Sequence, residues 1–167
     1  THFLDRLFAP ETIAVFGANE RTDSIAGRVY DNLRQGGFAG SIYAVNPKHE
    51  QIYGQPCYKS LQAIGKPVDL AVIATPAKTI PKIISACGER GVRAAIVIST
   101  GFNDSDKRGS KLKKALLKAA KAHQVRILGP NCLGLIRPRA GMNASFSKNT
   151  ARPGQLALIS QSGAICT

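Results

Sequence analysis

The stretch Thr12-Ile-Ala-Val-Phe-Gly-Ala-Asn19 decides the fold, because an apolar run ends in a glycine and a helical pattern opens a few polar residues later. This order is typical of the front end of a nucleotide-binding βαβ unit. A glycine at the carboxyl end of the first parallel strand lets a phosphate approach the backbone, and the following helix presents unpaired N–H groups and the positive end of its dipole. The stretch therefore predicts a nucleotide-binding turn at Gly17.

The rest of the chain repeats the order of strand and helix. We expect strands at residues 12–16, 41–45, 68–74, 93–99, 125–128 and 155–160, and helices at 3–8, 25–35, from 76 to about 90, and through the lysine-rich stretch after 106. Ser24 and Thr75 are the expected helix N-caps. A helical turn is expected near residues 60–63, and residues 129–149 are expected to be irregular around a short piece at 133–136. Short aliphatic strands that alternate with helices predict an α/β fold, a Rossmann-like, doubly wound and mainly parallel sheet.

Length, cysteine spacing and hydropathy narrow the class of protein. A chain of 167 residues suits one α/β domain. Its four cysteines have no C-x-x-C spacing, which favours reduced thiols over a zinc site or a disulfide framework. No apolar stretch approaches the roughly 20 residues of a membrane span, and the N-terminus lacks the layout of a signal peptide. We therefore expect a soluble, cytoplasmic protein with no membrane partner.

The chain is strongly basic, with 23 lysines and arginines against 10 acidic residues and a net charge of +13. A polyanionic small ligand, an acidic partner domain or a nucleic acid would all suit this charge. Much of the excess follows one helix face, at Lys107, Lys111, Lys114, Lys118 and Lys121. We interpret this face as solvated, because a nucleic-acid surface for single strands would carry interleaved aromatic residues.

Small or polar loops follow the expected strands, and the carboxyl ends of parallel strands meet at one edge of a sheet. Ligands of open α/β sheets bind at that edge, and six converging loops favour one extended ligand. The binding residues that we expect there are Gly17, Ala18, Asn19, Asn46, Pro47, Lys48, Thr75, Pro76, Ala77, Ser99, Thr100, Gly101, Phe102, Asn131, Cys132, Ser160, Ser162 and Gly163.

Lys48 narrows the class of ligand. The fingerprint G-x-G-x-x-G is absent, and an NAD site would place an Asp or Glu after the second strand to bind the ribose 2′-hydroxyl. A lysine there suits a ribose that carries a phosphate, as in NADP or in the 3′-phospho-ADP part of coenzyme A. An NADP-binding, redox-sensing regulatory domain therefore stays open as an alternative to a coenzyme A-binding module.

Catalytic and metal-binding constellations are not expected in this segment. His2, His49 and His123 lie beside no obvious nucleophile or carboxylate pair, so we interpret them as structural or solvated. Asp104 and Asp106 precede a helix, where N-capping explains them. The sequence predicts binding rather than reaction, with no catalytic residue and no metal ligand.

A family resemblance rests on eight motifs that together span nearly the whole chain. The chain closely resembles the N-terminal coenzyme A-binding domain of the NDP-forming acyl-CoA synthetases, relatives of the succinyl-CoA synthetase α subunit. The motifs are Ile13-Ala-Val-Phe-Gly-Ala-Asn19, Gly37-Phe-Ala-Gly40, Val45-Asn-Pro47, Val68-Asp-Leu-Ala-Val-Ile-Ala-Thr-Pro-Ala77, Val97-Ile-Ser-Thr-Gly-Phe102, Leu128-Gly-Pro-Asn-Cys-Leu-Gly134, Met142-Asn-Ala-Ser-Phe146 and Leu158-Ile-Ser-Gln-Ser-Gly-Ala164.

The resemblance implies that coenzyme A or acetyl-CoA lies along the loops at Gly17, 46–48, 75–77 and 99–102, with its sulfur directed toward Asn131 and residues 160–163. It also implies that the helix after the Ser-Gln-Ser-Gly turn points its N-terminus at a phosphohistidine of a following domain, which fits the attraction of such an end for anions. ATP or ADP, with Mg, would bind a separate ATP-grasp domain. The segment by itself is then not expected to catalyse the ligase reaction.

The resemblance also implies a division of the chain. Residues 1–150 are expected to form the coenzyme A-binding domain, and residues 151–167 a strand and the start of a helix that lead into a flavodoxin-type domain missing here. Two parent proteins share such a domain: an ADP-forming acyl-CoA or acetyl-CoA ligase, and a bacterial protein lysine acetyltransferase with a fused GNAT domain. The ending Ser162-Gly-Ala-Ile-Cys-Thr167 and the basic character lead us to expect the fused type.

Overall fold

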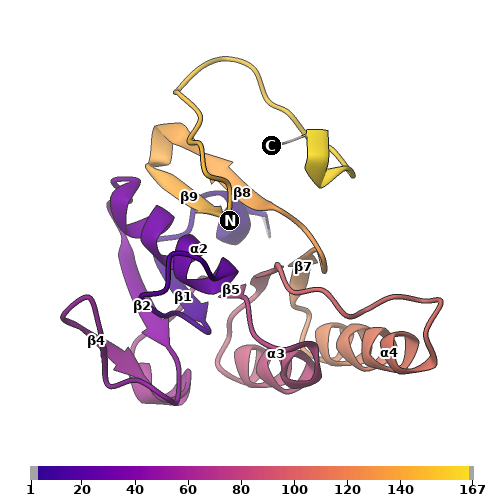
Figure 1. The fold of residues 1–167 in the computed structure, drawn as a ribbon. Coiled ribbons are helices and arrows are strands. Elements are labelled where there is room, and N and C mark those ends of the chain that lie inside the picture. Colours follow the sequence, from indigo (N-terminus) through magenta and orange to yellow (C-terminus); the bar gives the residue numbers. More distant parts are fainter. Residues whose placement is uncertain (1–3, 166–167) are drawn as a thin grey trace.

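Seven strands lie side by side in one sheet (Figure 1), with the order β3-β4-β2-β1-β5-β6-β7. The structure is a computed structural model, and it describes residues 4–165. Its elements are α1 (Asp5–Phe8), β1 (Thr12–Phe16), α2 (Ile25–Gln35), β2 (Ser41–Val45), β3 (Gln51–Ile52), β4 (Gln55–Tyr58), η1 (Gln62–Ile64), β5 (Leu70–Ile73), η2 (Ala77–Thr79), α3 (Ile80–Glu89), β6 (Ala94–Val97), α4 (Lys107–Ala122), β7 (Arg126–Leu128), β8 (Gly134–Arg137), η3 (Pro138–Ala140), β9 (Met142–Ser145) and η4 (Gly163–Ile165).

The strand register brings the carboxyl ends of the parallel strands into line. Phe16, the last residue of β1, pairs with Val45 of β2 and with Ile73 of β5. Ile73 in turn pairs with Val97, the last residue of β6. All strand pairs of this sheet are parallel except β3 with β4. The loops after β2, β1, β5 and β6 therefore leave one edge of the sheet in that spatial order, and we call this edge the rim.

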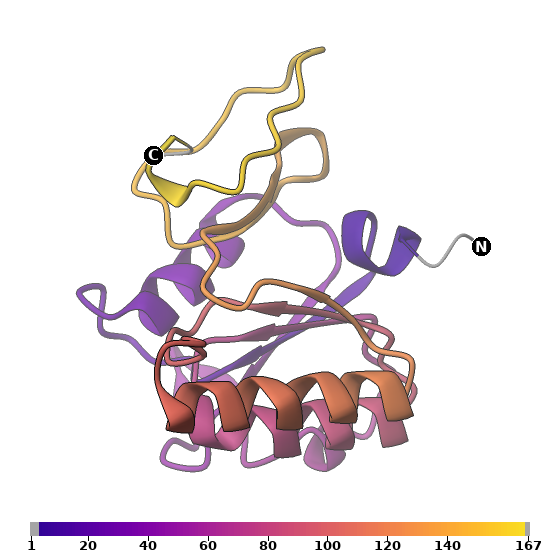
Figure 2. The ribbon, with the colours of Figure 1, turned by 90° about the vertical axis from the view of Figure 1, so that its right-hand side faces the viewer.

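Both faces of the sheet are covered, because successive side chains of a strand point to opposite faces. Ala14 and Phe16 belong to the core cluster that packs under α3 and α4. Ile13 and Val15 belong to a second cluster, which includes residues of α2 and of the β8–β9 hairpin. Figure 2 shows α3 and α4 together on one side of the sheet and the hairpin on the other. The predicted doubly wound α/β architecture is confirmed.

One of the two expected helix N-caps is present in the structure, and the other is not. The Ser24 hydroxyl caps α2 by accepting a hydrogen bond from Gly27 N at 3.0 Å, as expected. Thr75 does not cap α3: Pro76 has an extended ψ of 135°, a short η2 turn follows, and the α-helix begins at Ile80. The Thr75 hydroxyl instead accepts a hydrogen bond from the Thr79 hydroxyl at 2.9 Å. Pro76 therefore precedes a short turn and is not the first residue of the helix. The helix starts one turn later than expected.

Helix α4 has the two predicted faces. Leu116 and Ala120 are buried, while Lys107, Lys111, Lys114, Lys118 and Lys121 are exposed. The helix packs along α3, where the His123 side chain lies against the backbone of Gly88, so this histidine is structural as expected. Among the described residues, no helix has the length and apolar character needed to cross a bilayer.

Three predictions along the chain need correction. Residues 51–58 form the β3–β4 hairpin where a loop was expected, and residues 134–145 form the β8–β9 hairpin within the stretch expected to be irregular. Residues 155–160 are not a strand: Leu156 and Ile159 are 100% and 94% exposed. A strand needs a neighbour to pair its N–H and C=O groups, and no strand pairs with this segment in the part of the chain that the structure describes. The expected leading helix is α1, and Phe3 lies outside the described residues.

Candidate functional site

The turn after β1 lies at the topological switch point of the sheet. The chain runs from β1 outward to β2 on one side and later returns to β5 on the other, so the loops after β1 and β5 separate there. Gly17 has a φ of +89°, and its N–H donates to Val45 O at 2.8 Å. A Cβ at this position would lie 2.9 Å from Ala74 O. Any residue with a side chain would therefore strain this turn, and the approach of a ligand to the Gly17 backbone stays a prediction.

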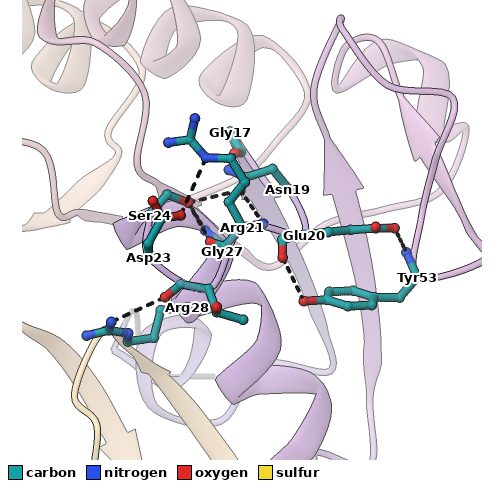
Figure 3. A network of polar contacts seen from close by, with 10 residues as sticks. Gly17, Asn19, Glu20, Arg21, Asp23, Ser24, Gly27, Arg28 and Tyr53 are labelled. Carbon is teal, nitrogen blue, oxygen red and sulfur yellow. Dashed lines mark hydrogen bonds and ion pairs between the residues drawn. The ribbon is translucent and has the colours of Figure 1, made fainter.

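The side chain of Asn19 holds the turn in shape (Figure 3). Its Nδ2 donates to Gly17 O at 3.0 Å, and its Oδ1 accepts from Arg21 N and from the Ser24 hydroxyl, each at 2.9 Å. The Ser24 hydroxyl also caps α2, so one amide links the strand end to the helix start. Asn19 is therefore a structural member of the binding turn, with its polar atoms used inside the loop.

The loop after β2 is bonded to the loop after β1. Asn46 Nδ2 donates to Ala18 O at 2.9 Å, and Asn46 Oδ1 accepts from Lys48 N at 3.0 Å. The side chain of Lys48 is exposed, and no ion pair is recorded for it among the described residues. The Lys48 ammonium group is therefore exposed in a loop that is bonded to the turn after β1, and its contact with an anion stays a prediction.

The loops after β5, β6 and β7 meet in the same way. The Ser99 hydroxyl donates to Thr75 O at 2.6 Å, and Asn131 N donates to Ser99 O at 3.1 Å. Gly101 has a φ of +101°, and a Cβ there would lie 3.1 Å from Ala77 Cβ. The structure thus brings together five of the six expected loops along the rim.

The remaining candidates have side chains that are used inside the protein, or they lie in the loop that does not join the rim. Phe102 is buried in the core under α3 and α4, so its ring supports the loop. The Cys132 thiol donates to Val97 O at 3.4 Å, and burial raises its pKa, so the group is a neutral, structural thiol. Ser160 and Ser162 bond to each other, and Ile165 N donates to Ser162 O within the same segment. The sixth loop is exposed and is not joined to the rim in the described residues.

A shallow cavity of about 400 Å³ adds residues that the sequence reasoning missed. Expected members Pro76, Ala77 and Gly101 line it together with Lys78, Asp106, Arg108 and Leu112. The Asp106 carboxylate is occupied by capping α4, where it accepts from Arg108 N and Gly109 N at 3.2 Å. No ion pair is recorded in the described residues for Lys78 or Arg108. Lys78 and Arg108 each follow a rim loop in the sequence, and this nearness was the signal that could have identified them.

Other polar groups of the chain have structural roles. Asp69 precedes β5 at the opposite edge of the sheet, where it accepts from Glu11 N and Thr12 N and forms an ion pair with Arg6. Cys87 is a buried residue of α3, and burial raises the pKa of its thiol to about 12. Cys57, Cys87 and Cys132 are free thiols, while Cys166 and His2 lie outside the described residues. No metal-binding cluster occurs within residues 4–165.

Comparison with known proteins assigns the chain to a family. The family model described as a CoA binding domain matches residues 11–138. The chain belongs to the CoA-binding domain family. It is 44% identical over 161 residues to acetate–CoA ligase [ADP-forming] I of Archaeoglobus fulgidus, covering 96% of this chain and 23% of that protein. It is 40% identical to the α subunit of the corresponding ligase of Pyrococcus furiosus, covering 97% of this chain and 36% of that subunit.

Solved structures agree with this assignment. An acetyl-coenzyme A synthetase of Ca. Korarchaeum cryptofilum, solved with phosphate and ADP, superposes with a TM-score of 0.90 at 36% identity, covering 97% of this chain and 34% of that one. An ATP citrate lyase of Methanothrix soehngenii, solved with citrate and coenzyme A, shares only the fold, at 15% identity and a TM-score of 0.51 over 76% of this chain and 21% of that one. The chain spans between about a quarter and a third of the ligases it matches.

Proposed function

We propose that this CoA-binding-family domain binds coenzyme A or acetyl-CoA along the rim, as one part of a larger ADP-forming acyl-CoA ligase. The observation that carries the proposal is the set of five adjoining loops at one edge of the sheet, where the tight Gly17 turn is bonded to the loop of Lys48, a lysine with no ion pair among the described residues. An extended ligand with a phosphorylated ribose fits a rim that has a cation beside a tight glycine turn. The family model and the ligase relatives support the same ligand.

We assign the nucleotide end of the ligand to Gly17, Ala18 and Lys48, and the pantetheine arm to the loops at 75–77 and 99–102. Asn131 is then nearest to the sulfur, because its loop follows the last parallel strand of the row. This order places the single free lysine of the 46–48 loop beside the 3′-phosphate. Lys78 and Arg108 border the middle of the rim and add positive charge that draws in the polyanionic ligand.

Calorimetric titration and thermal shift test this proposal directly. Coenzyme A at about 100 times its Kd is expected to stabilise the folded chain by about 2.7 kcal/mol, which raises Tm measurably. The Lys48→Ala variant is expected to weaken coenzyme A while leaving 3′-dephospho-coenzyme A unchanged, since only the former carries the phosphate that Lys48 meets. Lys66→Ala, an exposed lysine away from the rim loops, is the control.

Two results would reject the proposal. One is the absence of both heat and thermal shift with coenzyme A and acetyl-CoA at millimolar concentration. The other is a thermal shift with NADPH that exceeds the shift with coenzyme A, which would favour the NADP-binding alternative that Lys48 also suits. NAD is expected to give no shift, because the chain has Lys48 where an acidic partner of its ribose would stand.

The composition of the whole protein is also a proposal. The named relatives are archaeal ligases, which favours an ADP-forming ligase over the expected bacterial acetyltransferase with a GNAT domain. We propose that residues 1–150 form the coenzyme A-binding domain and that residues 151–167 lead into a following synthetase-like domain. ATP or ADP, with Mg, would then be handled by an ATP-grasp partner. Exposed Leu156, Leu158 and Ile159 are consistent with a segment that pairs with chain outside these residues.

The sequence and activity of the full-length parent decide between the two types. A ligase parent is expected to form ATP from acetyl-CoA, ADP and phosphate, whereas an acetyltransferase parent would transfer the acetyl group to a protein lysine. Hydrogen exchange gives an independent readout of the proposed boundary. Amides 156–159 are expected to be protected in the full-length protein and to exchange quickly in the 167-residue chain, and equal exchange in both would contradict the proposed pairing.

A further inference from the structure

The β3–β4 hairpin reaches across to the nucleotide-binding turn. Its tip consists of Tyr53 and Gly54, both in the left-handed region with φ of +50° and +69°. Two-residue turns with positive φ at both positions match the twist of a hairpin, and tyrosine rather than asparagine or glycine at the first position is unusual there. The tyrosine is therefore held at this tip by contacts of its own.

Those contacts go to Glu20, the residue after Asn19. Tyr53 N donates to Glu20 Oε1 at 2.6 Å, and the Tyr53 hydroxyl donates to Glu20 O at 3.2 Å. Figure 3 shows the two side chains reaching toward one another, one from the turn after β1 and one from the hairpin. The short bond to a carboxylate is the stronger of the two, because a charged acceptor strengthens a hydrogen bond.

The ring of Tyr53 has two contacts with one helix. The Arg34 guanidinium lies 4.2 Å from its centroid, and the Tyr30 ring stacks at 6.4 Å with an interplanar angle of 17°. Both partners come from α2, the helix that the binding turn opens. The hairpin tip is therefore anchored on the helix as well as on the turn, and we call the pair Glu20–Tyr53 the latch.

The segment that carries Lys48 is thus bonded to the binding turn at two places. Asn46 holds its start through Ala18 O, and the latch holds the hairpin beyond it through Glu20. Lys48 lies between these two anchors. A ligand that contacts both the turn and Lys48 then meets them at a preset separation, which reduces the entropy lost on binding.

We propose that Glu20 and Tyr53 are positioning residues for coenzyme A, which fix the Lys48 segment relative to the Gly17 turn. This inference rests on the proposed function. Neither latch residue needs to touch the ligand, because the bonds act on the backbone of the turn and of the hairpin. The latch residues differ in this from the expected binding residues, which are proposed to contact the ligand.

Glu20→Ala tests the latch, with Glu20→Gln as the conservative variant and Asp23→Ala as the matched control. Glutamine keeps an oxygen that accepts from Tyr53 N. Asp23 is an exposed acid of the same loop, paired only with Arg21 at 3.6 Å and not bonded to the hairpin. Calorimetry would measure Kd for coenzyme A and for 3′-dephospho-coenzyme A, with thermal unfolding of each free variant recorded beside it.

Glu20→Ala is expected to weaken coenzyme A by about three- to tenfold, the range for one lost hydrogen bond. The preference for coenzyme A over its dephospho form is expected to shrink, because Lys48 no longer meets the 3′-phosphate at the set position. Glu20→Gln is expected to restore most of the affinity, and Asp23→Ala to bind like the original chain. A purely structural role would lower Tm and leave that preference unchanged.

The proposal is overturned if Glu20→Ala keeps the affinity and the preference of the original chain, or if Asp23→Ala loses as much as Glu20→Ala. Loss in Glu20→Gln equal to that in Glu20→Ala would likewise reject the hydrogen-bonded latch. These failures differ from failure of the proposed function, in which the original chain itself does not bind coenzyme A.

Discussion

Gly17→Ala is expected to destabilise the chain by about 2–4 kcal/mol. The left-handed backbone at φ of +89° costs alanine about 1–2 kcal/mol. The new Cβ would lie 2.9 Å from Ala74 O, and moving that backbone carbonyl adds about 1–3 kcal/mol, typical of overpacking. Alanine also lowers the entropy of the unfolded chain, which offsets at most about 1 kcal/mol of this destabilisation.

Gly37→Ala is a matched control for the close packing. Gly37 also has a positive φ, +76°, but a Cβ there would meet nothing within 4 Å. Gly37→Ala therefore has only the cost of the left-handed backbone. We expect its free energy of unfolding to fall by about 1 kcal/mol or less, once the lower entropy of the unfolded chain is included. The difference between the two variants isolates the contact between the Gly17 turn and the end of β5.

Urea unfolding followed by circular dichroism measures both free energies, and thermal scans give the corresponding Tm values. For a chain of this size, 1 kcal/mol corresponds to about 2–4 °C in Tm. Gly17→Ala should also reduce the stabilisation by coenzyme A, because relieving the contact with Ala74 O displaces the turn that the ligand is proposed to approach. Equal destabilisation by the two variants would refute the packing argument.

Three further perturbations probe the fold. Asp69→Ala leaves the half-exposed Arg6 guanidinium and two backbone N–H groups without their acceptor and should cost about 2–4 kcal/mol in urea unfolding; a loss below about 1 kcal/mol would show that water replaces the carboxylate. Asp106→Ala removes the cap of α4 and should cost about 1–2 kcal/mol, while Asp106→Asn, which still caps, should cost less. Because the Cys87 pKa rises from 9.0 to about 12 on folding, the folded state holds the proton longer, so stability should fall as pH rises through this window, by up to about 1.4 kcal/mol per pH unit. Cys87→Ala should flatten that slope, and an unchanged slope would rule out Cys87 as its source.

Local patterns in the sequence were sufficient to predict the parallel sheet and the turn at Gly17. The apolar run 12–16, Gly17 and the Ser24 cap each act over a few residues, so the strand, the turn and the start of α2 follow from neighbouring side chains alone. The same holds for α4, whose apolar face repeats at helical spacing. Lys48 could be named as a cation at the rim because the end of a strand is a local feature.

Only the tertiary structure decided which loops bond to one another and which apolar runs find a partner. The Glu20–Tyr53 bonds join residues 33 positions apart, and the Ser99–Thr75 bond joins residues 24 positions apart, so neither appears in any local pattern. The pattern of residues 155–160 predicts a strand, yet no strand within residues 4–165 pairs with this run, and it remains exposed. A helix satisfies its backbone within its own segment, whereas a strand depends on another piece of chain, and that dependence sets the limit of what the sequence by itself determined.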